Sequence, residues 1–145
     1  MNLEKIQEMW ERDSQIDPDE LHTASLAVPS LHSKYYQLFN DLRLLRARAK
    51  KQYQSILHER HLYYSGKAEP EVYVEDPFPY KVREKDALQR YLDADKRLTE
   101  SELKIEYYDT MIDFLENIIK TIQNRTFQIK NAIEWQKFIS GYGGN

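Results

Sequence analysis

The sequence predicts an all-α chain, and three observations lead to that prediction. Only four glycines and five prolines occur in 145 residues, whereas Glu, Lys, Leu, Ile and Gln are abundant, a composition that favours helix. Apolar residues recur at spacings of three and four over long stretches. The C-terminal half also carries a sustained heptad pattern, which is typical of long packed helices. The length fits a single domain, residues 1–145.

The N-terminal part predicts a short helix followed by a break. Leu3, Ile6 and Trp10 lie on one helical face, so a short helix is expected within residues 1–16. Asp17 can then cap a second helix whose first position is taken by Pro18.

The next element is a long basic helix over residues 18–65. Pro29 lies inside it, and because its ring clashes with the preceding turn, a kink or restart is expected near 29. Gly66 suits the C-cap. Three prolines then predict a loop over 66–80. The apolar stripe of this helix consists of Tyr35, Leu38, Leu42, Leu45, Ala49 and Ile56.

A long C-terminal helix is predicted over residues 81–139, followed by a flexible tail at 140–145. Heptads from Tyr91 onward place apolar side chains at eleven of fourteen a and d positions, which predicts a coiled-coil-like seam. A break is possible near 93–95, because a second capping box begins at Thr99.

The apolar surface of this helix predicts assembly into a homo-oligomer of more than two subunits. A second row of apolar side chains lies beside the a and d positions. A single covering helix from the same chain would therefore leave part of the apolar surface exposed to solvent. The residues expected to join subunits are Ile105, Ile112, Leu115, Ile119, Ile122, Ile129 and Ile133.

Composition excludes several classes of function. The net charge is only −3, cysteine is absent, and no run of 18 apolar residues could span a membrane. We find no signal peptide and expect an intracellular protein. His58 and His61 are three apart, not four as in zincins. No phosphate loop or nucleophile elbow is present, so we expect no enzyme, no metal and no cofactor.

Charge is unevenly distributed, and this is the one feature with functional content. Residues 34–67, here called the basic segment, carry eight basic side chains and two acidic ones, whereas the flanking parts are acidic. Cations interleaved with aromatic rings are what single-stranded nucleic acid requires. A solvated helix face, a membrane surface and an acidic partner helix are the alternatives. The candidate DNA-binding residues are Arg43, Arg46, Arg48, Lys50, Lys51, His58, Arg60, Tyr63, Tyr64 and Lys67.

Residues Leu57 to Gly66 resemble a stretch of the UvsY family of recombination mediator proteins from T-even-type bacteriophages. In that family a basic-x-Arg pattern precedes Tyr-Tyr-Ser-Gly, as Arg60 does here. The similarity looks collinear over most of the chain. It includes the opening Leu3–Glu8, the Ala94-Asp95-Lys96 step and the run from Phe127 to Lys130.

The resemblance implies a binding protein that acts in the host cell cytoplasm. Members bind single-stranded DNA as ring-like homo-oligomers and help load a RecA-like recombinase onto DNA covered by single-strand binding protein. One departure is His58, which stands at the first basic position and is mostly neutral at pH 7. The rival interpretation is a coiled-coil adaptor that binds only protein, with the basic segment docking on an acidic surface.

Overall fold

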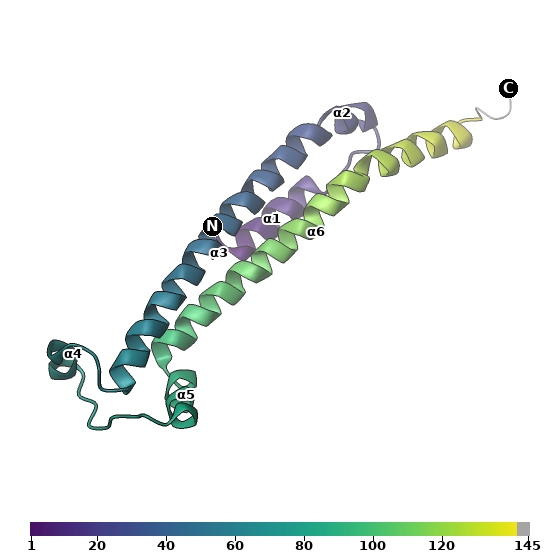
Figure 1. Cartoon of the computed structure of the whole chain (residues 1–145). Coiled ribbons are helices and arrows are strands. Elements are labelled where there is room, and N and C mark those ends of the chain that lie inside the picture. Colours follow the sequence, from purple (N-terminus) through teal and green to yellow (C-terminus); the bar gives the residue numbers. More distant parts are fainter. Residues whose placement is uncertain (142–145) are drawn as a thin grey trace. The chain divides into compact units, whose positions relative to one another are not determined.

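The computed structural model describes residues 1–141, and the predicted all-α class is confirmed. Within these residues the chain forms six helices and no strand (Figure 1). Positions 142–145 of the predicted tail lie outside the described residues. The helices are α1 (Leu3–Asp13), α2 (Leu21–Leu26), α3 (Val28–Tyr64), α4 (Pro70–Glu75), α5 (Lys85–Asp93) and α6 (Lys96–Ile139).

The chain divides into two compact units, where the sequence predicted one domain. Unit 1 comprises residues 1–43 and 110–145, and unit 2 comprises residues 44–109. The boundaries fall inside α3 and α6, so each long helix contributes one part to each unit. Continuous helix leaves no linker signature in the sequence, which is why composition alone did not indicate the division.

The core of unit 1 is built from facing parts of α1, α3 and α6. The indole of Trp10 meets the ring of Tyr35 edge-on, with ring centroids 5.4 Å apart. Asp13 at the end of α1 accepts hydrogen bonds from Lys34 Nζ at 2.6 Å and Tyr35 Oη at 2.8 Å. The buried apolar residues of this core include Ile6, Leu21, Tyr35, Leu42, Met111, Leu115, Ile118, Ile119, Ile122 and Ile129.

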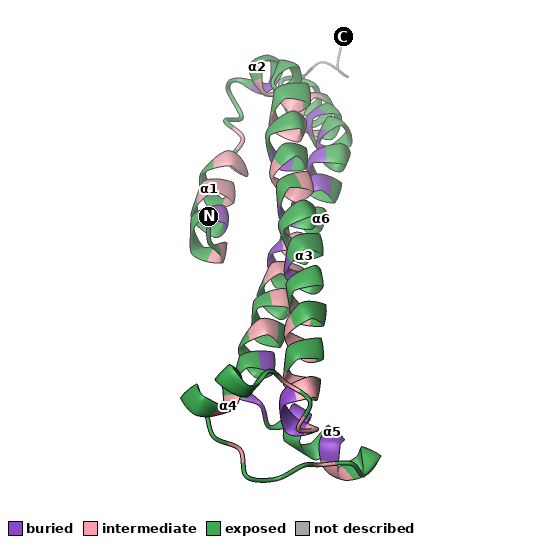
Figure 2. Cartoon of the chain, turned by 60° about the vertical axis from the view of Figure 1, so that its left-hand side comes forward, coloured by how far each residue is buried: buried purple, intermediate pink, exposed green. Residues whose placement is uncertain are grey.

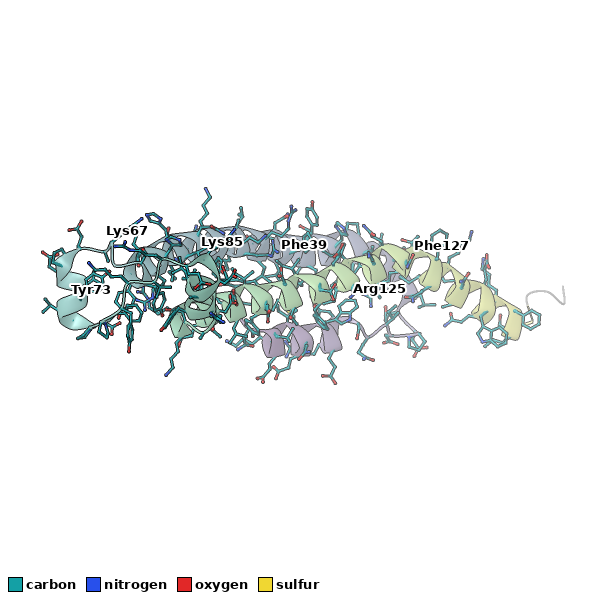
Figure 3. All side chains as sticks on the ribbon, turned by 60° about the horizontal axis from the view of Figure 1, so that its bottom comes forward. Phe39, Lys67, Tyr73, Lys85, Arg125 and Phe127 are labelled. Carbon is teal, nitrogen blue, oxygen red and sulfur yellow. The ribbon has the colours of Figure 1, made fainter. Side chains whose placement is uncertain are left out.

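A buried arginine of α6 caps the C-terminal end of α1 through hydrogen bonds. The Arg125 side chain, labelled in Figure 3, donates to the backbone carbonyls of Asp13, Ser14 and Gln15 at 3.1–3.2 Å. Carbonyls at a helix end lack intrahelical partners, and a cation there also complements the helix dipole. Arg125 therefore fastens α1 onto α6 within unit 1.

Unit 2 has a core of tyrosines and leucines. Its buried hydrophobic cluster consists of Tyr63, Tyr64, Leu88, Leu92 and Leu98. Partly buried hydrophobic residues from α3, α4 and the segment before α5 pack against them. Figure 2 shows that α4, in contrast, carries no buried residue.

Several predicted boundaries differ from the structure. The second helix begins at Leu21, not at 18, because Asp17 Oδ1 accepts from the Asp19 N–H at 2.9 Å and forms a tight turn instead of a helix cap. The break near Pro29 occurs at Ala27, so Pro29 lies in the first turn of α3, where its missing N–H costs nothing.

The region between the long helices also differs. The segment predicted as a loop contains α4, which starts at Pro70, a residue suited to a first helical position. The predicted helix over 81–139 is two helices, separated at Ala94 and Asp95. Asp95 Oδ1 caps α6 by accepting from the Leu98 N–H at 3.0 Å. Gly66 ends α3 with a φ of 77°, as predicted for a C-cap.

The predicted subunit seam lies mostly inside the chain's own core. Leu115, Ile119, Ile122 and Ile129 are buried within unit 1, and Ile105, Ile112 and Ile133 are half-buried. The heptad pattern identified a packed face correctly, but periodicity does not say whether the covering helix comes from the same chain. The assignment of the four buried residues to a subunit interface is therefore corrected.

Candidate nucleic-acid interface

Helix α3 displays a row of exposed cations in its central turns. In unit 2 the exposed cations of α3 are Arg48, Lys50 and Lys51. Arg43 precedes them on the helix and is also exposed, but it belongs to unit 1. Its guanidinium lies 5.6 Å from the ring centroid of Phe39. Long polar side chains suit these positions because α3 buries only a narrow apolar stripe there.

Arg46 differs from the other cations of this row. Its Nε donates to the Asp109 carboxylate of α6, and both residues belong to unit 2. The guanidinium is half-buried, so its charge is already matched within the chain. Arg46 therefore contributes less net positive potential than its neighbours.

A hollow of about 830 Å³ lies beside the two lysines of this row. At its edge the Tyr53 hydroxyl donates to Glu102 Oε1 at 3.0 Å. Burial raises the pKa of Tyr53, and its bond to the Glu102 carboxylate raises it further. The hollow is lined by Lys50, Lys51, Tyr53, Gln54, Ser55, Glu102, Ile105 and Glu106. It combines two lysines and one ring with two carboxylates on the α6 side, and Glu102 is already bonded to Tyr53.

Arg60 lies in a different environment. Its Nε donates to Asp95 Oδ2 at 2.7 Å, its Nη2 donates to Tyr64 Oη at 3.3 Å, and its side chain is only 12% exposed. The guanidinium also lies 4.2 Å from the ring centroid of Tyr63. These contacts leave Arg60 little access to a phosphate. The prediction that it contacts DNA is therefore not supported by its placement.

Asp95 is the centre of this cluster, which we call the Arg60 cluster (Arg60, Tyr63, Tyr64 and Asp95). Tyr64 Oη donates to Asp95 Oδ2 at 2.6 Å. Burial opposes ionisation of Asp95, but the hydrogen bonds from Tyr64, the Leu98 N–H and Arg60 hold its pKa below the ordinary value. Burial and the same carboxylate raise the pKa of Tyr64.

Tyr63 and Tyr64 are core residues, which corrects their assignment as base-stacking rings. Their side chains are 4% and 9% exposed. Tyr63 stacks on Tyr73 with centroids 5.5 Å apart, and its hydroxyl donates to the Asp76 carbonyl. The sequence offered one signal for this arrangement, the aspartate at position 95 of an otherwise helical stretch. The spacing of residues along the sequence does not indicate that Arg60 and Tyr64 are the partners of this aspartate.

The remaining predicted residues are exposed at the C-terminal end of the basic segment. His58 lies on the surface of α3, and Lys67 follows the Gly66 turn. Within the described residues no three His, Cys, Asp or Glu side chains are grouped so as to hold a metal ion. None of the helices in residues 1–141 is long and apolar enough to cross a membrane.

The fold and this surface define an all-α protein with a cationic helix surface of the kind that binds nucleic acid. The chain belongs to the UvsY family, because the family model described as "Recombination, repair and ssDNA binding protein UvsY" matches residues 9–142. The family resemblance predicted from Leu57–Gly66 is thereby confirmed. The chain is a recombination mediator that binds single-stranded DNA, and this confirms the predicted function over the adaptor alternative.

Curated and solved relatives agree with this assignment. The chain is 26% identical over 141 residues to "Recombination protein uvsY" of Enterobacteria phage T4, covering 97% of this chain and 99% of that protein. It superposes on a crystal structure of the bacteriophage T4 recombination mediator protein UvsY in lattice type II with a TM-score of 0.84, 27% identity, and coverage of 97% and 99%. Lattice type I gives a TM-score of 0.81 at 25% identity, with coverage of 92% and 98%.

Proposed function

We propose that the strand is bound along the unit 2 part of α3 by Arg48, Lys50 and Lys51, with a further contact from Lys67. The observation that supports this is the row of exposed cations beside the hollow at Tyr53 and Gln54. Cations that track a phosphate backbone, next to polar groups and a ring, fit a single strand of any sequence.

The proposed action is binding without catalysis. Each subunit supplies a weak site, and several sites on one homo-oligomer hold a strand by avidity. We propose that these sites also bend the strand. The bent strand then receives a RecA-like recombinase in place of the single-strand binding protein that covers it. The family match supports a role in recombination on single-stranded DNA. The two protein partners and an action in the host cell cytoplasm are part of the proposal.

Subunit contacts are proposed at the C-terminal end of α6, replacing the buried heptad residues. Trp135 and Phe138 stack with ring centroids 5.7 Å apart, and the two side chains are 61% and 70% exposed. Phe127 and Ile139 are also exposed on this stretch. Large apolar side chains gathered on one exposed helical segment are typical of a surface covered by another subunit.

Replacing Lys50 and Lys51 with alanine is expected to weaken single-strand binding on all sequences alike. Each lost phosphate contact should lower the slope of log affinity against log salt by about 0.7. A fluorescence titration with labelled oligonucleotide at several salt concentrations measures both quantities. The matched control, Lys120→Ala with Lys130→Ala, removes two exposed cations of α6. Equal loss in the control would show that the binding surface lies elsewhere.

Replacing Trp135 and Phe138 with serine is expected to dissociate the oligomer while helix content is retained, since both side chains are exposed in the subunit. Sedimentation velocity and circular dichroism measure the two properties. Leu26→Ser serves as a control, because Leu26 is equally exposed but lies on α2. A wild-type chain that sediments as a monomer at micromolar concentration would refute the proposed assembly.

A further inference from the structure

A second hollow in unit 2 is not used by the proposed α3 surface. It lies where the turn after α3, helix α4 and the segment before α5 meet, and its volume is about 410 Å³. Figure 3 labels two side chains of this region, Lys67 in the turn and Tyr73 on α4. The hollow is lined by Gly66, Ala68, Pro70, Tyr73, Phe78, Pro79, Tyr80 and Lys81.

Two aromatic residues that line this hollow, Tyr73 and Phe78, are held in place by contacts with the core of unit 2. Tyr73 Oη donates to the Tyr63 carbonyl at 2.9 Å and accepts from the Ala68 N–H at 3.2 Å. The Phe78 ring packs against Tyr63 and Tyr64, with centroids 5.3 and 5.2 Å away. Rings fixed by the core present a binding surface without an entropic cost of ordering them.

Tyr80 differs from Tyr73 and Phe78 because it is largely exposed to solvent. Its ring meets Phe78 nearly edge-on, with centroids 5.7 Å apart, and the residue is 62% exposed. Tyr80 therefore contributes little to the core. Its face is available to a flat ligand that enters the hollow beside Phe78.

A cation lies at the edge of the same hollow. Lys81 lines it, and the stem of this lysine lies so close to Gly66 that a Cβ there would stand 2.7 Å from Lys81 Cγ. Gly66 has a φ of 77°, which only glycine adopts readily. The glycine therefore permits both the turn and the close approach of the Lys81 side chain. The lining contains this lysine and no carboxylate, which favours an anionic ligand.

We propose that this hollow takes one unstacked base of the bound single strand. The base stacks against Tyr80 beside Phe78, and the Lys81 ammonium pairs with the neighbouring phosphate. This inference rests on the proposed function, because the strand is the ligand, but it places a contact outside the α3 row. It also explains why an exposed tyrosine lies between a proline and a lysine in the segment before α5.

A comparison of two strands tests the base contact. An oligothymidylate and an abasic strand of the same length present the same phosphates but differ in bases. Tyr80→Ala is expected to weaken binding of oligothymidylate roughly tenfold and to leave binding of the abasic strand unchanged. The salt slope should not change, because stacking releases no counterions. Tyr80→Phe keeps the ring and should bind both strands as the wild type does.

The outcomes separate this inference from the proposed function. No loss in Tyr80→Ala, or an equal loss on both strands, overturns the base pocket. If Lys50→Ala with Lys51→Ala leaves binding unchanged while Tyr80→Ala loses only the oligothymidylate, the α3 surface is wrong and the pocket stands. Circular dichroism and sedimentation of each variant check that fold and assembly are intact, as expected for so exposed a side chain.

Discussion

Arg60→Ala is expected to lower the free energy of unfolding by about 3–5 kcal/mol, because it leaves the buried Asp95 carboxylate without its cation. Asp95 is 2% exposed at its side chain, so water cannot replace the lost partner. The substitution also removes the guanidinium from the faces of Tyr63 and Tyr64. Urea unfolding followed by circular dichroism measures the loss. A change below about 0.5 kcal/mol, typical of surface positions, would contradict the buried ion pair.

Asp95→Asn decides between a structural and a DNA-contacting Arg60. If Arg60 bound phosphate, removing the Asp95 charge would free the guanidinium and tighten DNA binding. If Arg60 acts within the Arg60 cluster, as its contacts indicate, the variant is less stable and binds DNA no more tightly than the wild type. Tighter binding by a folded Asp95→Asn protein would restore Arg60 as a DNA contact.

The same cluster gives stability a defined dependence on pH. The pKa of Asp95 in the folded chain is held below its ordinary value of 3.8. The ionised carboxylate therefore stabilises the fold above that value, and its contribution is lost as pH falls through the lower native pKa. Asp13 in unit 1 has a lowered pKa for the same reason, with Lys34 and Tyr35 as partners. Below about pH 4 the unfolding free energy should fall, and less steeply in Asp95→Asn.

Ile122→Ala is expected to destabilise the chain by about 2–5 kcal/mol through the cavity it leaves. Ile122 is fully buried within unit 1, so the loss should appear in the free energy of unfolding. Ile122→Asp would place a charge in the same dry site, and we expect that variant to be unfolded. Urea unfolding and sedimentation velocity, run on the same samples, measure fold and assembly separately.

Leu103→Ala is the matched control on the same helix. Leu103 is 58% exposed and lies outside the proposed subunit contact, so its truncation should change the unfolding free energy by no more than about 0.5 kcal/mol. If Ile122→Ala instead dissociated the oligomer and left the unfolding free energy of the subunit unchanged, the heptad residues would form the subunit seam after all.

The sequence by itself determined the all-α class, the family and the basic character of α3. These properties depend on composition, on the order of residues along the chain, and on apolar spacing within single helices. The break near 93–95 was also predicted, although from a capping box at Thr99. Thr99 lies inside α6, and Asp95 provides the cap instead. Such local signals can be recognised in the sequence without knowing which other helices pack nearby.

Only the tertiary structure decided which residues of these helices are available for binding. Arg60, Tyr63 and Tyr64 had the residue types and spacing of a DNA contact. The Asp95 carboxylate, 31 to 35 positions away, instead holds Arg60 and Tyr64 in the core, and Tyr63 stacks there on Tyr73. Ile122 had the spacing of a subunit seam, but the chain's own helices cover it. Helical periodicity states which side chains share a face. It does not state what covers that face, because the covering residues are distant in sequence and are brought there by packing.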